Sequence, residues 1–220
     1  MTKAKTNKAR IAYNEIQMRN LAELDLPSQA KAMGLEWDEK AKAVRVKFLG
    51  REYLVANDGI TATDGKFPTV DAKSVLAHYL ASKGTGDPSP DFLPLKRLTG
   101  IASGTSGPSE NLSKPLGDKF GPNYEAFGKA ALEIGARHEG RSPAGAQAFL
   151  LEDLPKLPVR LEFFEADDEF EAESKVLFNS ASTRFVSYEC LELITMCVVV
   201  EMLLKAGLIS DPEECEASFI

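Results

Sequence analysis

The densest group of polar side chains in this sequence lies in one turn near the C-terminal end. Residues 176–194 read VLFNSASTRFVSYECLELI, in which an apolar run is separated from a helical pattern by Asn179, Ser180, Ser182, Thr183 and Arg184. A serine nucleophile needs a partner base, and the sequence has neither a G-x-S-x-G elbow nor an S-x-x-K motif here. Anion binding at the helix N-terminus beside Arg184 is a second interpretation. Helix capping by Ser187 is the third, and it is favoured.

Imidazole and thiol groups are few. The chain has two histidines and three cysteines, namely His78, His138, Cys190, Cys197 and Cys215, and no C-x-x-C pair. A zinc or iron–sulfur site usually needs three or four such ligands, so no metal site and no catalytic residue is predicted. His78 would be the first ligand to test for a metal-centred cofactor, although a hydrogen-bonded structural role is more typical of a lone helical histidine. His138 is expected near a helix C-terminus, where the dipole favours a positive imidazole.

The hydrophobic periodicity of the sequence indicates both helices and strands, and these elements must position the polar groups named above. Helical patterns cover residues 8–24, 27–33, 71–83, 112–121, 123–140 and 187–205. Period-two alternation marks a small antiparallel meander over 43–66 and further strands over 146–164 and 174–178, and the apolar part of 91–98 fits an edge strand. The sequence therefore predicts an α+β fold, with small antiparallel sheets packed against several helices and a long C-terminal helix. Residues 1–33 are interpreted as an N-terminal docking helix, 34–207 as the single domain, and 208–220 as an acidic tail.

Charge and hydropathy limit the classes of partner that the protein is expected to have. The net charge is −7 and the pI about 5.1, which argues against a nucleic-acid partner. The N-terminus has no apolar signal region, and the longest apolar run, LITMCVVVEMLL, is interrupted by Glu201. No membrane partner and a cytoplasmic location are therefore expected. The seven carboxylates of 162–173 lack the central glycine and alternation of a calcium loop, so a solvated hairpin rim is predicted there.

Four segments together resemble one known family. They are FLGREYLV (48–55), LAHYLASKGT (76–85), PLGDKFG (115–121) and LPVRLEFFEADDEFEAESKVLFNSASTRFVSYECLEL (157–193). In this order they resemble an uncharacterised prokaryotic family catalogued only as a domain of unknown function, found largely in anaerobes. The resemblance implies an accessory role, since some relatives are associated with iron–sulfur or corrinoid proteins. Members often carry a tryptophan-containing segment and an aromatic stretch after KGT, and this chain departs from that pattern. In the turn they commonly have a histidine or similar residue where Arg184 stands, followed by an aromatic residue, as Phe185 is here.

Three functions follow as hypotheses. The leading one is a non-catalytic ligand-binding or accessory domain with a small-molecule or protein partner and no identified cofactor. The second is a protein that binds a corrinoid, another tetrapyrrole or some other cofactor through His78, Tyr79, Lys83, Ser180, Ser182 and Arg184. The third is a small hydrolase or transferase that uses the turn at 179–187.

Overall fold

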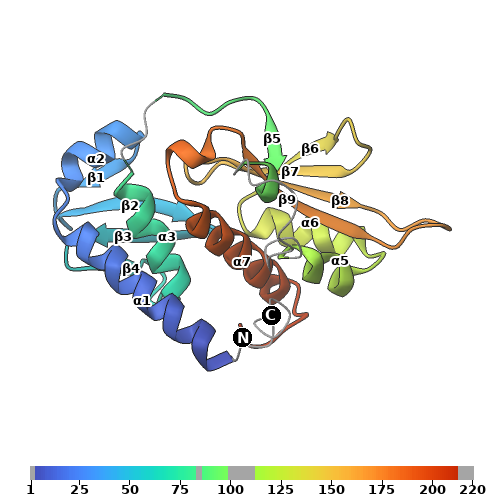
Figure 1. Ribbon diagram of the computed structural model, residues 1–220, viewed down its shortest axis with the longest axis horizontal. Helices are drawn as coiled ribbons and strands as arrows, with labels where there is room; N and C mark the ends of the chain where they lie inside the picture. Colours follow the sequence, from blue (N-terminus) through green and yellow to red (C-terminus); the bar gives the residue numbers. More distant parts are fainter. Residues whose placement is uncertain (1–2, 83–85, 99–111, 213–220) are drawn as a thin grey trace.

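The computed structural model describes residues 3–82, 86–98 and 112–212. These residues form two antiparallel sheets and a set of helices around one continuous hydrophobic core. Figure 1 shows the C-terminal helix α7 (Tyr188–Lys205) in the middle, with α1 (Lys3–Ala22) and the first sheet on one side and the second sheet on the other. The predicted α+β class and the long C-terminal helix are confirmed.

The first sheet is the predicted meander, with strand order β1-β2-β3-β4. Its strands are β1 (Glu36–Asp38), β2 (Ala43–Phe48), β3 (Arg51–Ala56) and β4 (Gly59–Ala62). Leu49 and Gly50 form the two-residue turn between β2 and β3, both with positive φ, as a type I′ hairpin turn requires. A Cβ on Gly50 would lie 2.6 Å from the carbonyl oxygen of Glu133, so this turn presses against the end of the neighbouring helix α6 (Tyr124–Glu133).

The second sheet has the order β5-β9-β8-β7-β6. Its strands are β5 (Phe92–Pro94), β6 (Arg137–Arg141), β7 (Gln147–Leu151), β8 (Val159–Phe164) and β9 (Glu173–Asn179). The predicted edge strand is confirmed as β5, which pairs with β9. The prediction for His138 is wrong: α6 ends at Glu133, Gly135 turns the chain with φ of 92°, and His138 lies in the exposed edge strand β6.

The acidic run 162–173 is not exposed along its whole length. Residues 165–171 are exposed in the connection between β8 and β9, as the predicted solvated rim requires. Glu162 differs, because it lies inside β8 and is only 7% exposed. The solvated rim is therefore shorter than the acidic run.

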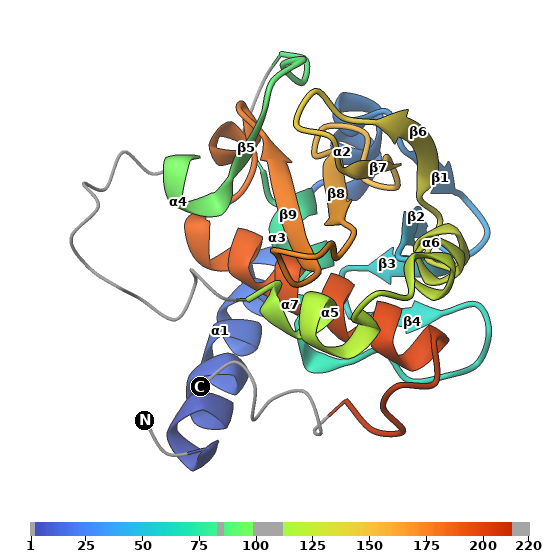
Figure 2. The ribbon, with the colours of Figure 1, turned by 90° about the vertical axis from the view of Figure 1, so that its right-hand side faces the viewer.

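Helices cover the inner faces of both sheets. The remaining ones are α2 (Leu26–Met33), α3 (Val70–Leu80), α4 (Leu95–Leu98) and α5 (Lys114–Phe120). Helix α1 packs along α3, α3 packs on α7, and α5 and α6 contact α7 from the other side. Figure 2, turned by 90°, shows α5 beside β9 with α7 running through the core. Gly117 permits the contact between α5 and β9, because a Cβ there would lie 2.9 Å from the carbonyl oxygen of Ala172, the residue before β9.

Helix α7 is largely apolar and most of its residues are buried, which is typical of a helix packed against protein on several sides. It begins after Ser187, whose Oγ accepts a hydrogen bond from the Cys190 backbone N–H at 3.4 Å. The predicted N-cap is therefore confirmed. In the part of the chain that the structure describes, no helix is long and apolar enough to cross a membrane.

Candidate functional site

A cavity of about 210 Å³ lies where the β2–β3 hairpin, the start of α3 and the C-terminal half of α7 meet. Phe48 and Leu49 line it from the hairpin, and Met196 and Val200 line it from α7. These side chains give the cavity largely apolar walls. Arg10 of α1 and Pro212 complete the lining, so five separate chain segments build the cavity and it depends on the tertiary fold.

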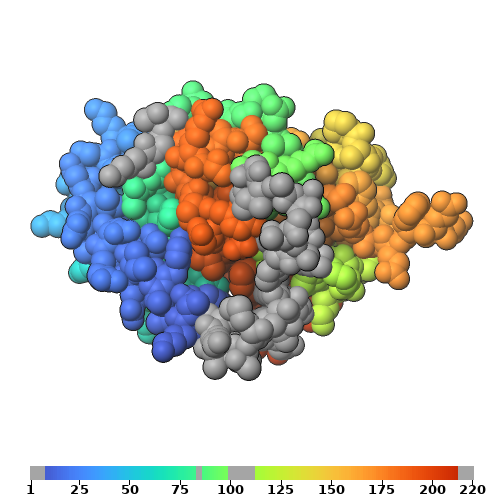
Figure 3. Space-filling view, in the orientation of Figure 1, coloured from blue at the N-terminus to red at the C-terminus, as the bar shows by residue number. Residues whose placement is uncertain are grey.

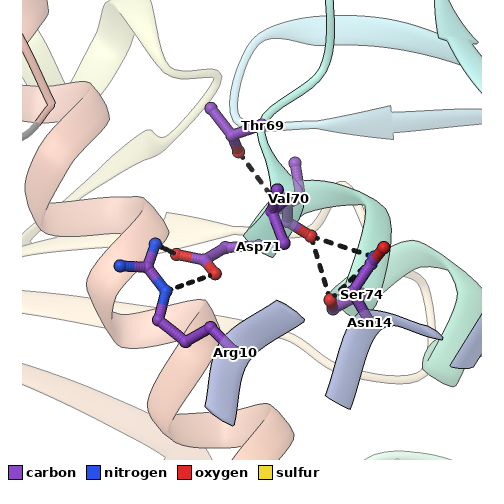
Figure 4. Close-up of polar contacts among 7 residues, drawn as sticks. Arg10, Asn14, Thr69, Val70, Asp71 and Ser74 are labelled. Carbon is purple, nitrogen blue, oxygen red and sulfur yellow. Dashed lines mark hydrogen bonds and ion pairs between the residues drawn. The ribbon is translucent and has the colours of Figure 1, made fainter. Parts of the chain in front are cut away.

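An ion pair closes one side of this cavity. Arg10 of α1 forms a bidentate ion pair with Asp71, in which Nε donates to Oδ1 at 2.9 Å and Nη2 contacts Oδ2 (Figure 4). Asp71 is only 6% exposed and lies in the first turn of α3, where the helix dipole also stabilises a carboxylate. The attraction between the two charges offsets part of the cost of removing them from water, so the pair can form a polar wall of the cavity.

Neighbouring hydrogen bonds fix the same junction of α1 and α3. The Asn14 side-chain amide donates to Ser74 Oγ at 3.0 Å and to the Val70 carbonyl at 3.3 Å (Figure 4). Thr69 caps α3 by accepting a hydrogen bond from the Ala72 backbone N–H at 3.2 Å. Helix α1 is therefore held in a defined register on α3, and this register positions Arg10.

Two polar groups line the cavity without a hydrogen bond to any residue that the structure describes: the Tyr53 hydroxyl and the Glu201 carboxyl. Tyr53 is 2% exposed, and burial raises the pKa of its hydroxyl to about 12, while the nearby Arg51 guanidinium opposes that rise. Burial also raises the pKa of the Glu201 carboxyl above its usual range, against the opposing charge of Arg51. Both groups line the cavity, where their polar atoms are available to a ligand.

Cys197 also lines the cavity, but its thiol is not suited to nucleophilic chemistry. Burial raises the pKa of the Cys197 thiol well above its usual range, and the carboxyls of Asp71 and Glu201 add to the rise. The thiolate is the nucleophilic form of cysteine, and here it is strongly disfavoured. Cys197 therefore contributes an apolar surface to the cavity.

His78, predicted as a first cofactor ligand, has both ring nitrogens in hydrogen bonds. Its Nε2 accepts from the Ser187 backbone N–H at 3.2 Å, so the neutral ring carries its proton on Nδ1, which donates to the Tyr13 hydroxyl oxygen at 2.8 Å. Burial lowers the pKa of the His78 imidazole, and Glu189 partly opposes this. These contacts join α1, α3 and the start of α7, which gives His78 a structural role.

The predicted turn at 179–187 is also held by internal contacts. Asn179 is fully buried, and its Oδ1 accepts from the backbone N–H groups of Ser89 and Ala181, both at 2.9 Å. Ser180 uses its backbone N–H to bind the Asp91 carbonyl at 2.8 Å. Ser182 is fully buried in the 3₁₀ turn Ser182–Arg184, and its Oγ has no partner among the described residues.

The other predicted site residues do not converge on one ligand. Tyr79 is fully buried and its hydroxyl accepts from the Lys156 backbone N–H at 3.2 Å, on a different side of α3 from His78. Arg184 is exposed and lines a separate surface depression together with His78. Lys83 lies outside the described residues. The structure thus brings His78 and Arg184 together, but neither lines the apolar cavity.

One feature of the sequence is a signal for this cavity. Glu201 interrupts an otherwise apolar run, and a carboxylate inside an apolar helix normally requires a functional or structural reason. Arg10 and Asp71 carried no comparable signal, because charged residues on a polar helix and in a first helical turn are ordinary, and their contact spans 61 positions.

The fold and the cavity define a class: an α+β protein with two antiparallel sheets around a central helix and a small, largely apolar cavity beside that helix. Residues 25–201 match the family described as Domain of unknown function (DUF3786), and the chain belongs to that family. Membership in an uncharacterised family, expected from the four segments, is thereby confirmed. Neither the curated proteins nor the solved structures contain a match.

Proposed function

We propose that the protein is a non-catalytic ligand-binding domain whose ligand is a small, largely apolar amine held in the cavity beside α7. The observation that carries this proposal is the pairing of apolar walls with two polar groups, the Tyr53 hydroxyl and the Glu201 carboxyl, that make no hydrogen bond to the described residues. Ligand sites commonly combine apolar walls with a few convergent polar groups.

The volume supports a ligand with about one ring. A cavity of about 150 Å³ lined by apolar side chains binds benzene, and sites for drug-sized ligands span roughly 300–1,000 Å³. At about 210 Å³, the cavity lies between these values. A monocyclic compound with a short polar arm fits this range.

The charges support an amine as the polar arm. Arg10 forms an ion pair with Asp71, so the charge of Asp71 is balanced. Glu201 is a second carboxyl in the lining and is not balanced by Arg10. An ammonium group would pair with Glu201 and would favour its ionised form, which burial disfavours. The Tyr53 hydroxyl would accept a second hydrogen bond from the same ammonium group.

Two other functions have less support. A tetrapyrrole is larger than the drug-sized ligands that need roughly 300–1,000 Å³, and His78 uses both ring nitrogens inside the fold. A serine hydrolase would need a base beside Ser180 or Ser182, and the described residues supply no hydrogen-bonded base to either hydroxyl.

Calorimetry with three matched monocyclic ligands tests the proposal: 2-phenylethylamine, 2-phenylethanol and phenylacetate. The amine should bind most tightly, the alcohol weakly, and the acid least, because its carboxylate would face Glu201. Filling the cavity by Val200→Phe should abolish binding of the amine. Failure of the amine to bind, or tighter binding of the acid, would refute the proposal.

The chain offers a matched control for the carboxylate. Glu192 lies on the same helix, is half-buried, and has a pKa that burial raises, but it does not line the cavity. Glu201→Gln should weaken amine binding by roughly tenfold to a hundredfold, the range for a hydrogen bond to a charged group, and should leave the alcohol unaffected. Glu192→Gln should change neither affinity. Equal effects of the two variants would show that general electrostatics, and not the cavity, holds the ammonium group.

A further inference from the structure

A second depression, of about 300 Å³, lies on the surface well away from the apolar lining described above. Its walls are the last turns of α1, the end of α3 and the 3₁₀ turn before α7. Figure 3 shows α3 reaching the surface here, between the N-terminal helices and the segment that leads into α7. No lining residue is shared between the two sites.

Gln17 is the unusual residue of this depression. Its side chain is buried, with 6% of the residue exposed, yet its amide has no hydrogen bond to the described residues and lines the depression. The Gln17 amide is not among the enclosed polar atoms that lack a partner, so it is reached from the depression, and an amide offers two N–H donors and one acceptor oxygen. Gln17 therefore presents hydrogen-bonding groups to whatever fills the depression.

The charge of the lining selects the class of ligand. Arg184 is the charged side chain among the described lining residues, and it has no ion pair within the described chain. Asn20 adds a second amide from α1, one turn from Gln17. Glu189 is close enough to raise the pKa of His78 but does not line the depression. The lining thus combines N–H donors with one guanidinium.

His78 and Ser187 form a fixed wall. The Ser187 N–H is already donated to His78 Nε2, so the start of α7 does not supply this N–H to a ligand. Binding would instead depend on Gln17, Asn20 and Arg184, which come from α1 and the 3₁₀ turn.

We infer that this depression binds an oxyanion, a carboxylate or phosphate group of a small molecule, through the Arg184 guanidinium and the Gln17 amide. A guanidinium matches two oxygens of such a group with parallel N–H donors. The amide of Gln17 adds a donor from the buried side. This site is independent of the amine cavity, so either can exist without the other.

Heteronuclear NMR of the full chain tests this inference by following the side-chain amide signals of Gln17. Sodium phosphate and sodium acetate are titrated separately, with sodium chloride keeping the ionic strength constant. A saturable shift of the Gln17 signals is expected with at least one salt. Tighter binding of phosphate would indicate a phosphorylated ligand, and tighter binding of acetate would indicate a carboxylate. Absence of saturation with both salts would overturn the inference.

Two exposed arginines provide the matched comparison. Arg184→Gln should lower the affinity for the anion by about tenfold to a hundredfold, the range for a charge-assisted hydrogen bond. Arg97→Gln removes the same charge from an exposed position outside the depression and should change the affinity by less than about twofold. Equal losses in both variants would overturn the site in favour of diffuse attraction. Glu201→Gln should leave anion binding unchanged, which separates this result from the amine proposal.

Discussion

Alanine at Gly50 should destabilise the protein far more than alanine at Gly34, although both glycines have the same backbone conformation. Their φ angles are 72° and 70°. Gly34 has open space around the Cβ position, whereas a Cβ on Gly50 would lie 2.6 Å from the Glu133 carbonyl oxygen and 3.2 Å from the Ile134 Cα. The pair therefore separates the cost of left-handed backbone from the cost of steric overlap.

The magnitudes follow from these two terms. A left-handed conformation costs a residue with a Cβ roughly 1–2 kcal/mol, and the reduced freedom of the unfolded chain returns about 0.4–1 kcal/mol. Gly34→Ala should therefore cost about 1 kcal/mol or less. Overpacking adds roughly 1–3 kcal/mol, and the atoms that a Gly50 methyl would meet are backbone atoms that cannot rotate away. Gly50→Ala should then cost about 2–4 kcal/mol.

Urea denaturation of both variants measures the difference in the free energy of unfolding. The β2–β3 hairpin also carries the cavity residues Phe48, Leu49 and Tyr53, so Gly50→Ala should weaken amine binding while Gly34→Ala should not. Equal destabilisation by the two variants would refute the close packing of this hairpin on the end of α6.

Three further outcomes follow from the buried groups. Asn179→Ala should lower the free energy of unfolding by about 2–4 kcal/mol in urea denaturation, since two backbone N–H groups lose their acceptor. Because burial lowers the pKa of His78, the unfolded chain takes up a proton more readily than the folded one as the pH falls below about 6.5. Stability should therefore decline over that range, and His78→Gln should flatten the decline in denaturation curves recorded at several pH values. The third outcome concerns the buried Cys197 thiol, whose pKa burial raises. In a Cys215→Ser protein, this thiol should react with a colorimetric thiol reagent only as fast as the chain unfolds. Fast labelling of the native protein would contradict this burial.

Much of the local structure could be predicted because local chemistry determines it. The alternation of Val44, Val46 and Phe48 with charged residues predicts a strand with one buried face, and Gly50 supplies the positive φ of the hairpin. Ser187 predicts the start of α7 because a serine there can accept an N–H of the first turn. None of these features requires knowledge of distant contacts.

Strand β6 shows where such patterns fail. Residues 137–141 read RHEGR and have no apolar alternation, because this edge strand is exposed along nearly its whole length. The sequence therefore resembled the end of a charged helix. Only pairing with β7 identifies it as a strand, and that pairing is set by the fold of the second sheet.

The cavity could not be predicted for a related reason. Its ion pair joins Arg10 to Asp71 across 61 positions, and its lining combines a hairpin with a helix more than 140 residues further along the chain. Each residue has an ordinary local interpretation when taken alone. Glu201 was visible as an interruption of an apolar run, but its position in the cavity lining appears only once the neighbouring elements are in place.

The segments that carry the family resemblance contain residues that fix junctions of the fold. Gly50 and Gly117 permit close backbone approach, and His78 and Asn179 tie distant segments together. Arg10, by contrast, lies outside the matched residues 25–201. Membership in the family therefore supports the architecture around α7 more directly than it supports the cavity. Since the Arg10 charge offsets a carboxylate in the cavity wall, a member with a neutral residue at that position would have a more negative lining, and its cavity would favour a ligand with greater positive charge.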